Sequence, residues 1–191
     1  MSAATERVGT RGQARETWAA TLVVVVGCAV LVARPFAAAT GTRTALFAAS
    51  YLTIGLASIV VPLERERPRL APDLALVWGF GAVLVAVNVS ASPVPLPWSA
   101  AALPLSLLAA VAEEALFRRL AYARLERFGA VVAVVGSAVL FGLVHVPAYG
   151  LSALPVDVGA GLLFGWQRWA SGTWTVPAAT HAVANALVVL R

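Results

Sequence analysis

Residues 113–119 read Glu-Glu-Ala-Leu-Phe-Arg-Arg and place four charged side chains inside an apolar run that begins near Leu103. An ionised side chain at the centre of a membrane helix costs roughly 3 kcal/mol on insertion scales, so such residues usually have a function. On a helix, Glu114 and Arg118 lie at i and i+4 and can pair, whereas Glu113 points about 100° away. We therefore expect Arg118 to neutralise Glu114 and to leave Glu113 free for chemistry. A structural ion pair between buried helices is the alternative.

The composition is that of an integral membrane protein. Of 191 residues, 60% are hydrophobic and 12% are charged, against roughly 45–50% and 25% in soluble domains. All fourteen basic residues are arginines, and they cluster between apolar runs, which is a pattern of membrane topology and not of nucleic-acid binding. Cys28 is the single cysteine, so an intrachain disulfide and a CxxC metal site are excluded. The lipid bilayer is the expected partner, and nucleic acid is not.

The apolar runs predict an all-α fold, a polytopic transmembrane helical bundle of about seven spans. Residues 1–16 are expected to be a disordered cytoplasmic N-terminus, residues 17–97 to hold N-terminal transmembrane helices, and residues 98–191 to form a helical core. The expected spans are 18–33, 45–63, 73–90, 101–127, 130–146, 156–169 and 177–190. Pro147 should end the fifth span, and the prolines of residues 92–97 should form a stiff connector.

The arginines predict the orientation of these spans. With a cytoplasmic N-terminus, eleven of the fourteen fall on the cytoplasmic side, and only Arg34, Arg43 and Arg191 fall on the other. The basic start and first apolar run also fit a signal peptide, but the hydrophobic pattern continues into further spans, which favours an uncleaved helix. In the sixth span, the GxxxG spacing of Gly161 and Gly165 predicts a close approach between two helices.

Both histidines of the chain lie in or near expected spans. Glu113 lies sixteen residues before Gly129 and His145 sixteen after it, so an antiparallel hairpin about this glycine brings both to the same depth. In the last span, His181 and Asn185 lie at i and i+4 and project from one face. A carboxylate and an imidazole can deprotonate a shared water, while a second histidine and an amide can stabilise an oxyanion. This set of groups suits a hydrolase, although each can also serve as an interhelical hydrogen-bonding group.

Three motifs follow one another along the chain: EExxxR (Glu113, Glu114, Arg118), FxxxH (Phe141, His145) and HxxxN (His181, Asn185). Together they resemble the CPBP family of intramembrane glutamic endopeptidases, which includes the type II CAAX prenyl proteases and Abi-like bacterial relatives. The resemblance covers about residues 104–190. Arg119 departs from it, because the family commonly carries glycine at this position.

The resemblance implies an intramembrane peptide hydrolase that acts on a membrane-anchored polypeptide in a bacterial-type cytoplasmic membrane, with residues 98–191 as the catalytic core and with no cofactor or metal. Prenylated CAAX substrates are implied by the family name alone, and the sequence does not indicate an oligomeric state. The implied roles are water activation by Glu113 and His145, an oxyanion hole from His181 and Asn185, and orientation by Glu114 and Arg118. Phe117 and Phe141 would line the substrate, unless they only pack in the core.

Four other functions remain open from the residues. Glu113, His145 and His181 could supply three zinc ligands, although the chain lacks HExxH. A serine protease of the rhomboid type would need Ser137 to reach His145, about 12 Å along one helix. A non-catalytic scaffold or bacteriocin-immunity-type protein would use the same polar groups to bind a partner. A transporter would use them as a proton path.

Overall fold

The computed structural model of the protein is an all-α helical bundle, and it describes residues 3–36, 43–63, 69–89 and 101–190, with side chains from Trp18 onward except at residues 87–89. No strand occurs in these ranges. The helical elements are α1 (Ala3–Ala33), α2 (Arg43–Val60), α3 (Pro72–Val89), α4 (Ala102–Glu114), the π-helical segment η1 (Ala115–Ala121), α5 (Tyr122–Glu126), α6 (Ala130–Tyr149), the 3₁₀ turn η2 (Leu151–Ala153), α7 (Leu154–Ser171) and α8 (Thr175–Val189). Because α4, η1 and α5 follow one another without a break, the described ranges form seven long helical segments.

The observed helices lie over the seven expected ranges, with most ends shifted by one to three residues, and two of the differences have a clear physical reason. Residues 3–16, expected to be disordered, continue α1 as helix, since adding a residue to a formed helix avoids the cost of nucleation. Pro147 does not end its helix, and α6 runs on to Tyr149. Proline has no backbone N–H, so Pro147 removes a single helical hydrogen bond close to the end of the helix. The helix stops at Gly150, whose φ of 81° is a conformation that glycine adopts at little cost. The expected connector at residues 92–97 lies outside the described residues.

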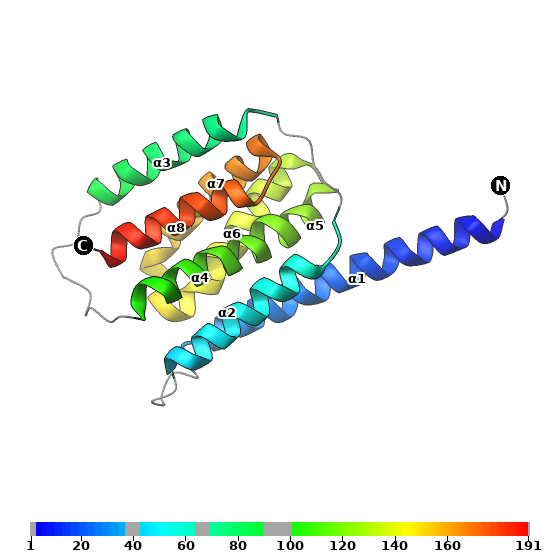
Figure 1. Ribbon diagram of the computed structural model, residues 1–191, viewed down its shortest axis with the longest axis horizontal. Helices are drawn as coiled ribbons and strands as arrows, with labels where there is room; N and C mark the ends of the chain where they lie inside the picture. Colours follow the sequence, from blue (N-terminus) through cyan, green and yellow to red (C-terminus); the bar gives the residue numbers. More distant parts are fainter. Residues whose placement is uncertain (1–2, 37–42, 64–68, 90–100, 191) are drawn as a thin grey trace.

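The helices pack as a bundle in which neighbours in space are often distant in sequence (Figure 1). Helices α1 and α2 lie side by side, and the N-terminal part of α1 extends away from the other helices. Helix α4 packs against α2 and α8, and α3 covers α7 and α8. Helices α5 and α6 form the expected hairpin about Gly129, which has a φ of 109°. This arrangement brings α1, α2, α6 and α8 around the charged stretch at the junction of α4 and η1.

Helices α6 and α7 approach each other closely at the GxxxG sequence. A Cβ atom built on Gly161 would lie 2.8 Å from the Cα of Ala138, and one on Gly165 would lie 3.2 Å from the carbonyl oxygen of Val134. Glycine at both positions therefore permits backbone contact between the two helices. The expected close approach is confirmed.

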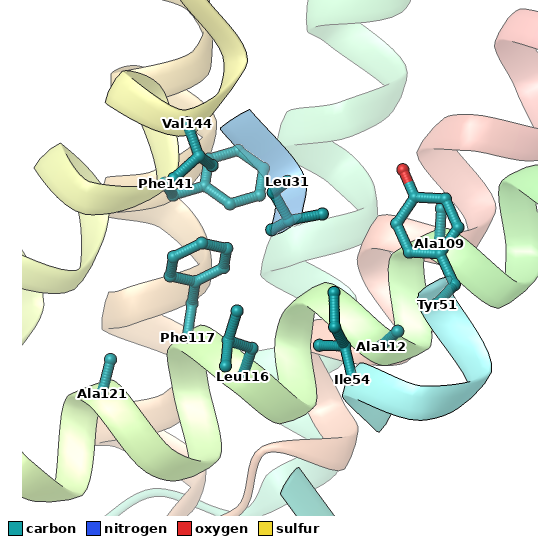
Figure 2. Close-up of a cluster of buried hydrophobic side chains, with 10 residues drawn as sticks. All are labelled: Leu31, Tyr51, Ile54, Ala109, Ala112, Leu116, Phe117, Ala121, Phe141 and Val144. Carbon is teal, nitrogen blue, oxygen red and sulfur yellow. The ribbon is translucent and has the colours of Figure 1, made fainter. Parts of the chain in front are cut away.

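The largest apolar cluster joins the N-terminal helices to the charged stretch (Figure 2). Leu116 and Phe117 of η1 are fully buried in it, and Leu31 of α1 and Ile54 of α2 pack into the same cluster. Burying a large apolar side chain contributes roughly 1.5–3 kcal/mol. The cluster therefore holds α1 and α2 against η1, next to Glu113 and Glu114.

Much of the outer surface is apolar. Within the described residues, α2 and α6 are long and apolar enough to cross a membrane, and shorter apolar stretches cover Trp18–Ala33, Pro72–Ala86 and Thr175–Val189. On α2, Leu52, Leu56 and Val60 form one stripe with exposed fractions of 50%, 65% and 77%. In water such a surface is unfavourable, whereas lipid would cover it.

Candidate active site

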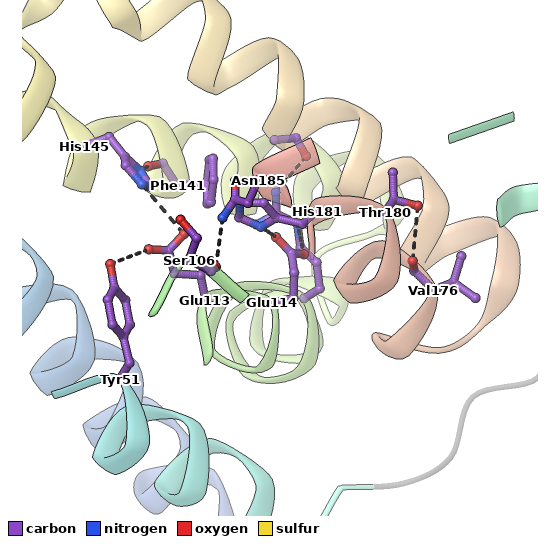
Figure 3. Close-up of polar contacts among 12 residues, drawn as sticks. Tyr51, Ser106, Glu113, Glu114, Phe141, His145, Val176, Thr180, His181 and Asn185 are labelled. Atoms are coloured by element: carbon purple, nitrogen blue, oxygen red, sulfur yellow. Dashed lines mark hydrogen bonds and ion pairs between the residues drawn. The ribbon is translucent and has the colours of Figure 1, made fainter. Parts of the chain in front are cut away.

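Glu113 and His145 meet across two helices. The Oε2 atom of Glu113 lies 3.7 Å from Nε2 of His145, and both residues are buried (Figure 3). The Nδ1 atom of His145 lies 2.7 Å from the carbonyl oxygen of Phe141. Because a carbonyl only accepts hydrogen bonds, Nδ1 carries a proton, and Nε2 faces the carboxylate and is an acceptor whenever the ring is neutral. The hairpin thus brings the acid and the imidazole to the same depth, as the spacing about Gly129 indicated.

The second oxygen of Glu113 is occupied by groups from α1 and α2. The hydroxyl of Tyr51 donates to Oε1 at 3.2 Å, and Nη1 of Arg34 forms an ion pair with the same oxygen at 3.8 Å. Arg118 pairs with Glu114 as expected and leaves Glu113 to other groups, but the expectation did not include the charged partner that Arg34 supplies. That expectation rested on spacing within one helix, which carries no information about side chains from other helices.

Glu114 has two partners. Nε of Arg118 lies 3.3 Å from its Oε2 atom, which is the expected i, i+4 ion pair, and both side chains are fully buried. Nδ1 of His181 lies 3.0 Å from its Oε1 atom. Arg118 also donates through Nη2 to the carbonyl oxygen of Gly161 at 3.1 Å. Glu114 therefore links the π-helical segment to α8, and Arg118 links the same segment to α7.

Asn185 lies one turn beyond His181 on α8 and donates through Nδ2 to the carbonyl oxygen of Ser106 at 3.0 Å. This bond ties α8 to α4. An amide nitrogen has two hydrogens, so one of them remains for another acceptor. The structure therefore brings His181 to Glu114 and Asn185 to Ser106, with both side chains on the α4-facing side of α8 (Figure 3).

Aromatic rings separate and orient the two histidines. The ring of Phe141 lies 4.6 Å from that of His145 and 5.7 Å from that of His181, measured between centroids. Phe117 packs edge-on against Phe141 at 5.5 Å, and the two are 0% and 3% exposed. This burial is what core packing requires, while contact with a substrate stays a prediction. Phe164, which the motifs did not indicate, stacks on His181 at 4.9 Å.

The sequence comparisons assign this group of residues to a family. Residues 95–187, about half of the chain, match the family model described as type II CAAX prenyl endopeptidase Rce1-like. These residues form an Rce1-like domain. That family consists of integral membrane proteases, and the match confirms the resemblance drawn from the three motifs. No curated protein and no solved structure matches the chain.

The Rce1-like domain contains every residue that the motifs indicated, but the structure adds Arg34 and Tyr51 from outside it. The sequence signal for either residue is weak. Tyr51 is a hydroxyl-bearing ring in an apolar span, and Arg34 follows an apolar run, where arginines are common in any membrane protein.

The charged stretch itself adopts π-helical geometry just after Glu114. Short π-helical segments inside α-helices occur often at functional sites. The carbonyl oxygen of Arg118, inside this segment, accepts a hydrogen bond from Nε of Arg168 at 2.9 Å. Arg119 donates to the carbonyl oxygens of Ser58 and Val61 at the end of α2. The arginine that departs from the family pattern thus holds the end of α2 against the Rce1-like domain.

The geometry offers less support for a zinc site or a serine nucleophile. Among the described residues, no three His, Cys, Asp or Glu side chains are grouped as metal ligands would be. Ser137 donates to the carbonyl oxygen of Val134 in its own helix at 3.3 Å, and not to a histidine. A cavity of about 480 Å³ between α1 and α2 has an almost wholly apolar lining that includes no histidine or carboxylate.

Proposed function

We propose that the protein is a membrane-spanning endopeptidase that hydrolyses peptide bonds of membrane-anchored polypeptides with a water activated by Glu113 and His145. The observation that carries this proposal is the 3.7 Å separation of Glu113 Oε2 and His145 Nε2. Both atoms are hydrogen-bond acceptors when the His145 ring is neutral and its Nδ1 donates to Phe141. A water between them would donate one hydrogen to each, which leaves its lone pairs for attack on a carbonyl carbon.

In this mechanism the water oxygen bonds to the carbonyl carbon, and its proton passes to the Glu113–His145 pair. The carbonyl oxygen becomes an oxyanion that accepts hydrogen bonds from His181 and Asn185. Because Nδ1 of His181 contacts Glu114, donation from Nε2 to the oxyanion requires a proton on each ring nitrogen. When the carbon–nitrogen bond breaks, the leaving amine takes the proton from the pair. The products are a carboxylic acid and an amine, and no covalent intermediate forms.

The surroundings of the site support a membrane location. The buried carboxylates and arginines lie behind apolar helix faces, and the Rce1-like family is one of integral membrane proteases. We extend this to about seven spans in a bacterial-type cytoplasmic membrane with a cytoplasmic N-terminus, on the arginine distribution. In a Cys28→Ser background, labelling of single cysteines introduced at Ser2 and at Ser152 from either side of a vesicle tests the orientation.

The test is cleavage of a membrane-tethered fluorogenic peptide by the purified protein in lipid vesicles. Prenylated and acylated forms of one peptide are compared, because the family description names prenyl substrates. Glu113→Gln and His145→Ala should each lower kcat by roughly 10²–10⁴-fold. Glu126→Gln is the matched control, since Glu126 lies on α5 and pairs with Arg69 at 3.6 Å.

Three outcomes contradict the proposal. Activity that survives Glu113→Gln would remove the glutamate from the mechanism. Activity that a strong chelator abolishes and zinc restores would indicate a metalloprotease. A cellular phenotype that Glu113→Gln leaves intact, with no cleavage of either peptide, would indicate a scaffold or immunity protein.

A further inference from the structure

Two side chains that precede the Rce1-like domain contact the carboxylate on which the proposed mechanism depends. Tyr51 of α2 donates its hydroxyl to Oε1 of Glu113 at 3.2 Å, and Nη1 of Arg34 lies 3.8 Å from that oxygen. The domain match begins at residue 95, so both residues belong to the N-terminal helices. Oε2 faces His145 instead. The two oxygens of Glu113 therefore have different partners from different parts of the chain.

The Arg34 side chain is almost completely removed from water, so its positive charge needs a nearby negative charge. Its side chain is 8% exposed and lies over the rings of Phe47 at 5.5 Å and Tyr51 at 5.3 Å. A guanidinium removed from water is costly unless it is paired. The carboxylate within ion-pair distance is that of Glu113, itself 3% exposed. Each residue thus compensates the buried charge of the other.

The neighbouring carboxylate, that of Glu114, is also buried beside an arginine. Glu114 is paired with Arg118, and Glu113 is paired with Arg34. The first pair lies within one continuous helix, whereas the second joins α4 to the end of α1. The adjacent glutamates therefore have separate cations, and the charge balance of Glu113 depends on the packing of the N-terminal helices.

We propose that Arg34 and Tyr51 are positioning residues that hold Oε1 of Glu113 and thereby direct Oε2 towards His145 and the reacting water. The α1–α2 pair is then a required part of the active site and not only a membrane anchor. This inference rests on the proposed function. Without the two contacts, the Glu113 side chain can rotate, and a misplacement of about 1 Å can reduce the rate by roughly 10²-fold.

The first experiment measures kcat and KM for the tethered peptide in vesicles. Tyr51→Phe should lower kcat by about tenfold and Arg34→Gln by about 10²-fold, with KM changed less than about twofold, because the contacts act on the reacting water and not on the substrate. Arg34→Lys should recover about tenfold over Arg34→Gln, since it restores a cation beside Glu113.

The chain offers a matched control for each variant. Arg43→Gln removes an arginine that stacks on the same Phe47 ring, at 5.4 Å, but lies exposed on α2. Ser50→Ala removes a hydroxyl next to Tyr51 that bonds only to the carbonyl of Leu46 within α2 at 2.7 Å. Both controls should keep wild-type kcat. A kcat of Arg34→Gln and Tyr51→Phe equal to that of these controls would overturn the inference.

A second measurement tests the pairing without any need for activity. In thermal unfolding, Arg34→Gln leaves Glu113 buried beside a neutral group, so adding Glu113→Gln should raise the melting temperature relative to Arg34→Gln alone. Additive losses would overturn the pairing. Failure of the proposed function is distinguishable: the wild-type protein would then cleave no peptide. If Glu113→Gln abolishes cleavage while Arg34→Gln and Tyr51→Phe do not reduce it, only the positioning role fails.

Discussion

Arg118 donates through Nη2 to the carbonyl oxygen of Gly161 at 3.1 Å, so a fully buried guanidinium joins the charged stretch to the helix that carries the GxxxG sequence. The same side chain forms the ion pair with Glu114, which in turn contacts His181. Arg118 therefore connects the close packing of α6 and α7 to the proposed oxyanion side of the site.

Replacement of Arg118 by lysine should destabilise the protein even though the charge is kept. An ammonium group on a flexible chain cannot reproduce two contacts made by different nitrogens of one planar guanidinium. Removing one member of a buried ion pair typically costs roughly 3–5 kcal/mol, and the lysine variant should lose a substantial part of that. Thermal unfolding in detergent micelles measures the change. Arg127→Lys, at an exposed position in the turn directly after α5, should melt like the wild type. Equal melting of the two variants would contradict the prediction.

Gly161→Ala should also destabilise the protein. The added Cβ would lie 2.8 Å from the Cα of Ala138, and a backbone atom cannot move aside as a flexible side chain can. Overpacking of this kind costs roughly 1–3 kcal/mol, which outweighs the gain of about 1 kcal/mol in helix propensity. Gly159→Ala on the same helix meets no atom within 4 Å and should be neutral or stabilising. A melting temperature of Gly161→Ala at or above that of Gly159→Ala would show that α6 and α7 do not approach as described.

Gly79→Ala should weaken the docking of α3 on α7 and α8. A Cβ at this position would overlap the side-chain amide of Gln167, which donates to the carbonyl oxygen of Ala75 at 3.0 Å and to the hydroxyl of Thr180 at 2.8 Å. Displacing that buried amide breaks hydrogen bonds that are worth roughly 1 kcal/mol each. Gly81→Ala, with open space around it, is the control. Protease digestion at the ends of α3, followed by mass spectrometry, should detect faster cleavage in Gly79→Ala than in Gly81→Ala, and equal rates would refute the contact.

Asn185→Ala should separate a catalytic role from a structural one. If Asn185 donates to the oxyanion, its removal should lower kcat by about 10²–10³-fold. Loss of its bond to Ser106 alone should reduce the free energy of unfolding by only about 1 kcal/mol. The comparison needs both kcat and melting temperature on one preparation. A variant that melts lower but keeps its kcat would assign Asn185 to interhelical packing and remove it from the proposed oxyanion hole.

The helices and the order of the motifs were predictable because they depend on local properties of the chain. The apolar runs marked each helix to within a few residues, except at the start of α1 and at Pro147 in α6. Glu113 and His145 could be placed at the same depth because a helix rises by a constant amount per residue on each side of Gly129. The pair of Glu114 and Arg118 followed from helical periodicity.

Contacts between distant helices depended on how each helix is rotated and tilted in the bundle, and no local pattern encodes that. The spacing of His181 and Asn185 placed both on one face of a helix, but it could not show that one contacts Glu114 and the other Ser106. Helical spacing assigned Arg118 to Glu114 and left Glu113 free, but it did not reveal that Arg34, in the turn after α1, and Tyr51 of α2 contact Glu113.

From its sequence alone, this protein was recognisable as a helical membrane protein with two carboxylates, two histidines and an amide in the order of a known peptidase family, since composition and spacing are properties of the unfolded chain. Only folding decided which partner each carboxylate oxygen faces. Segments up to about 80 residues apart in sequence must pack together before those side chains meet.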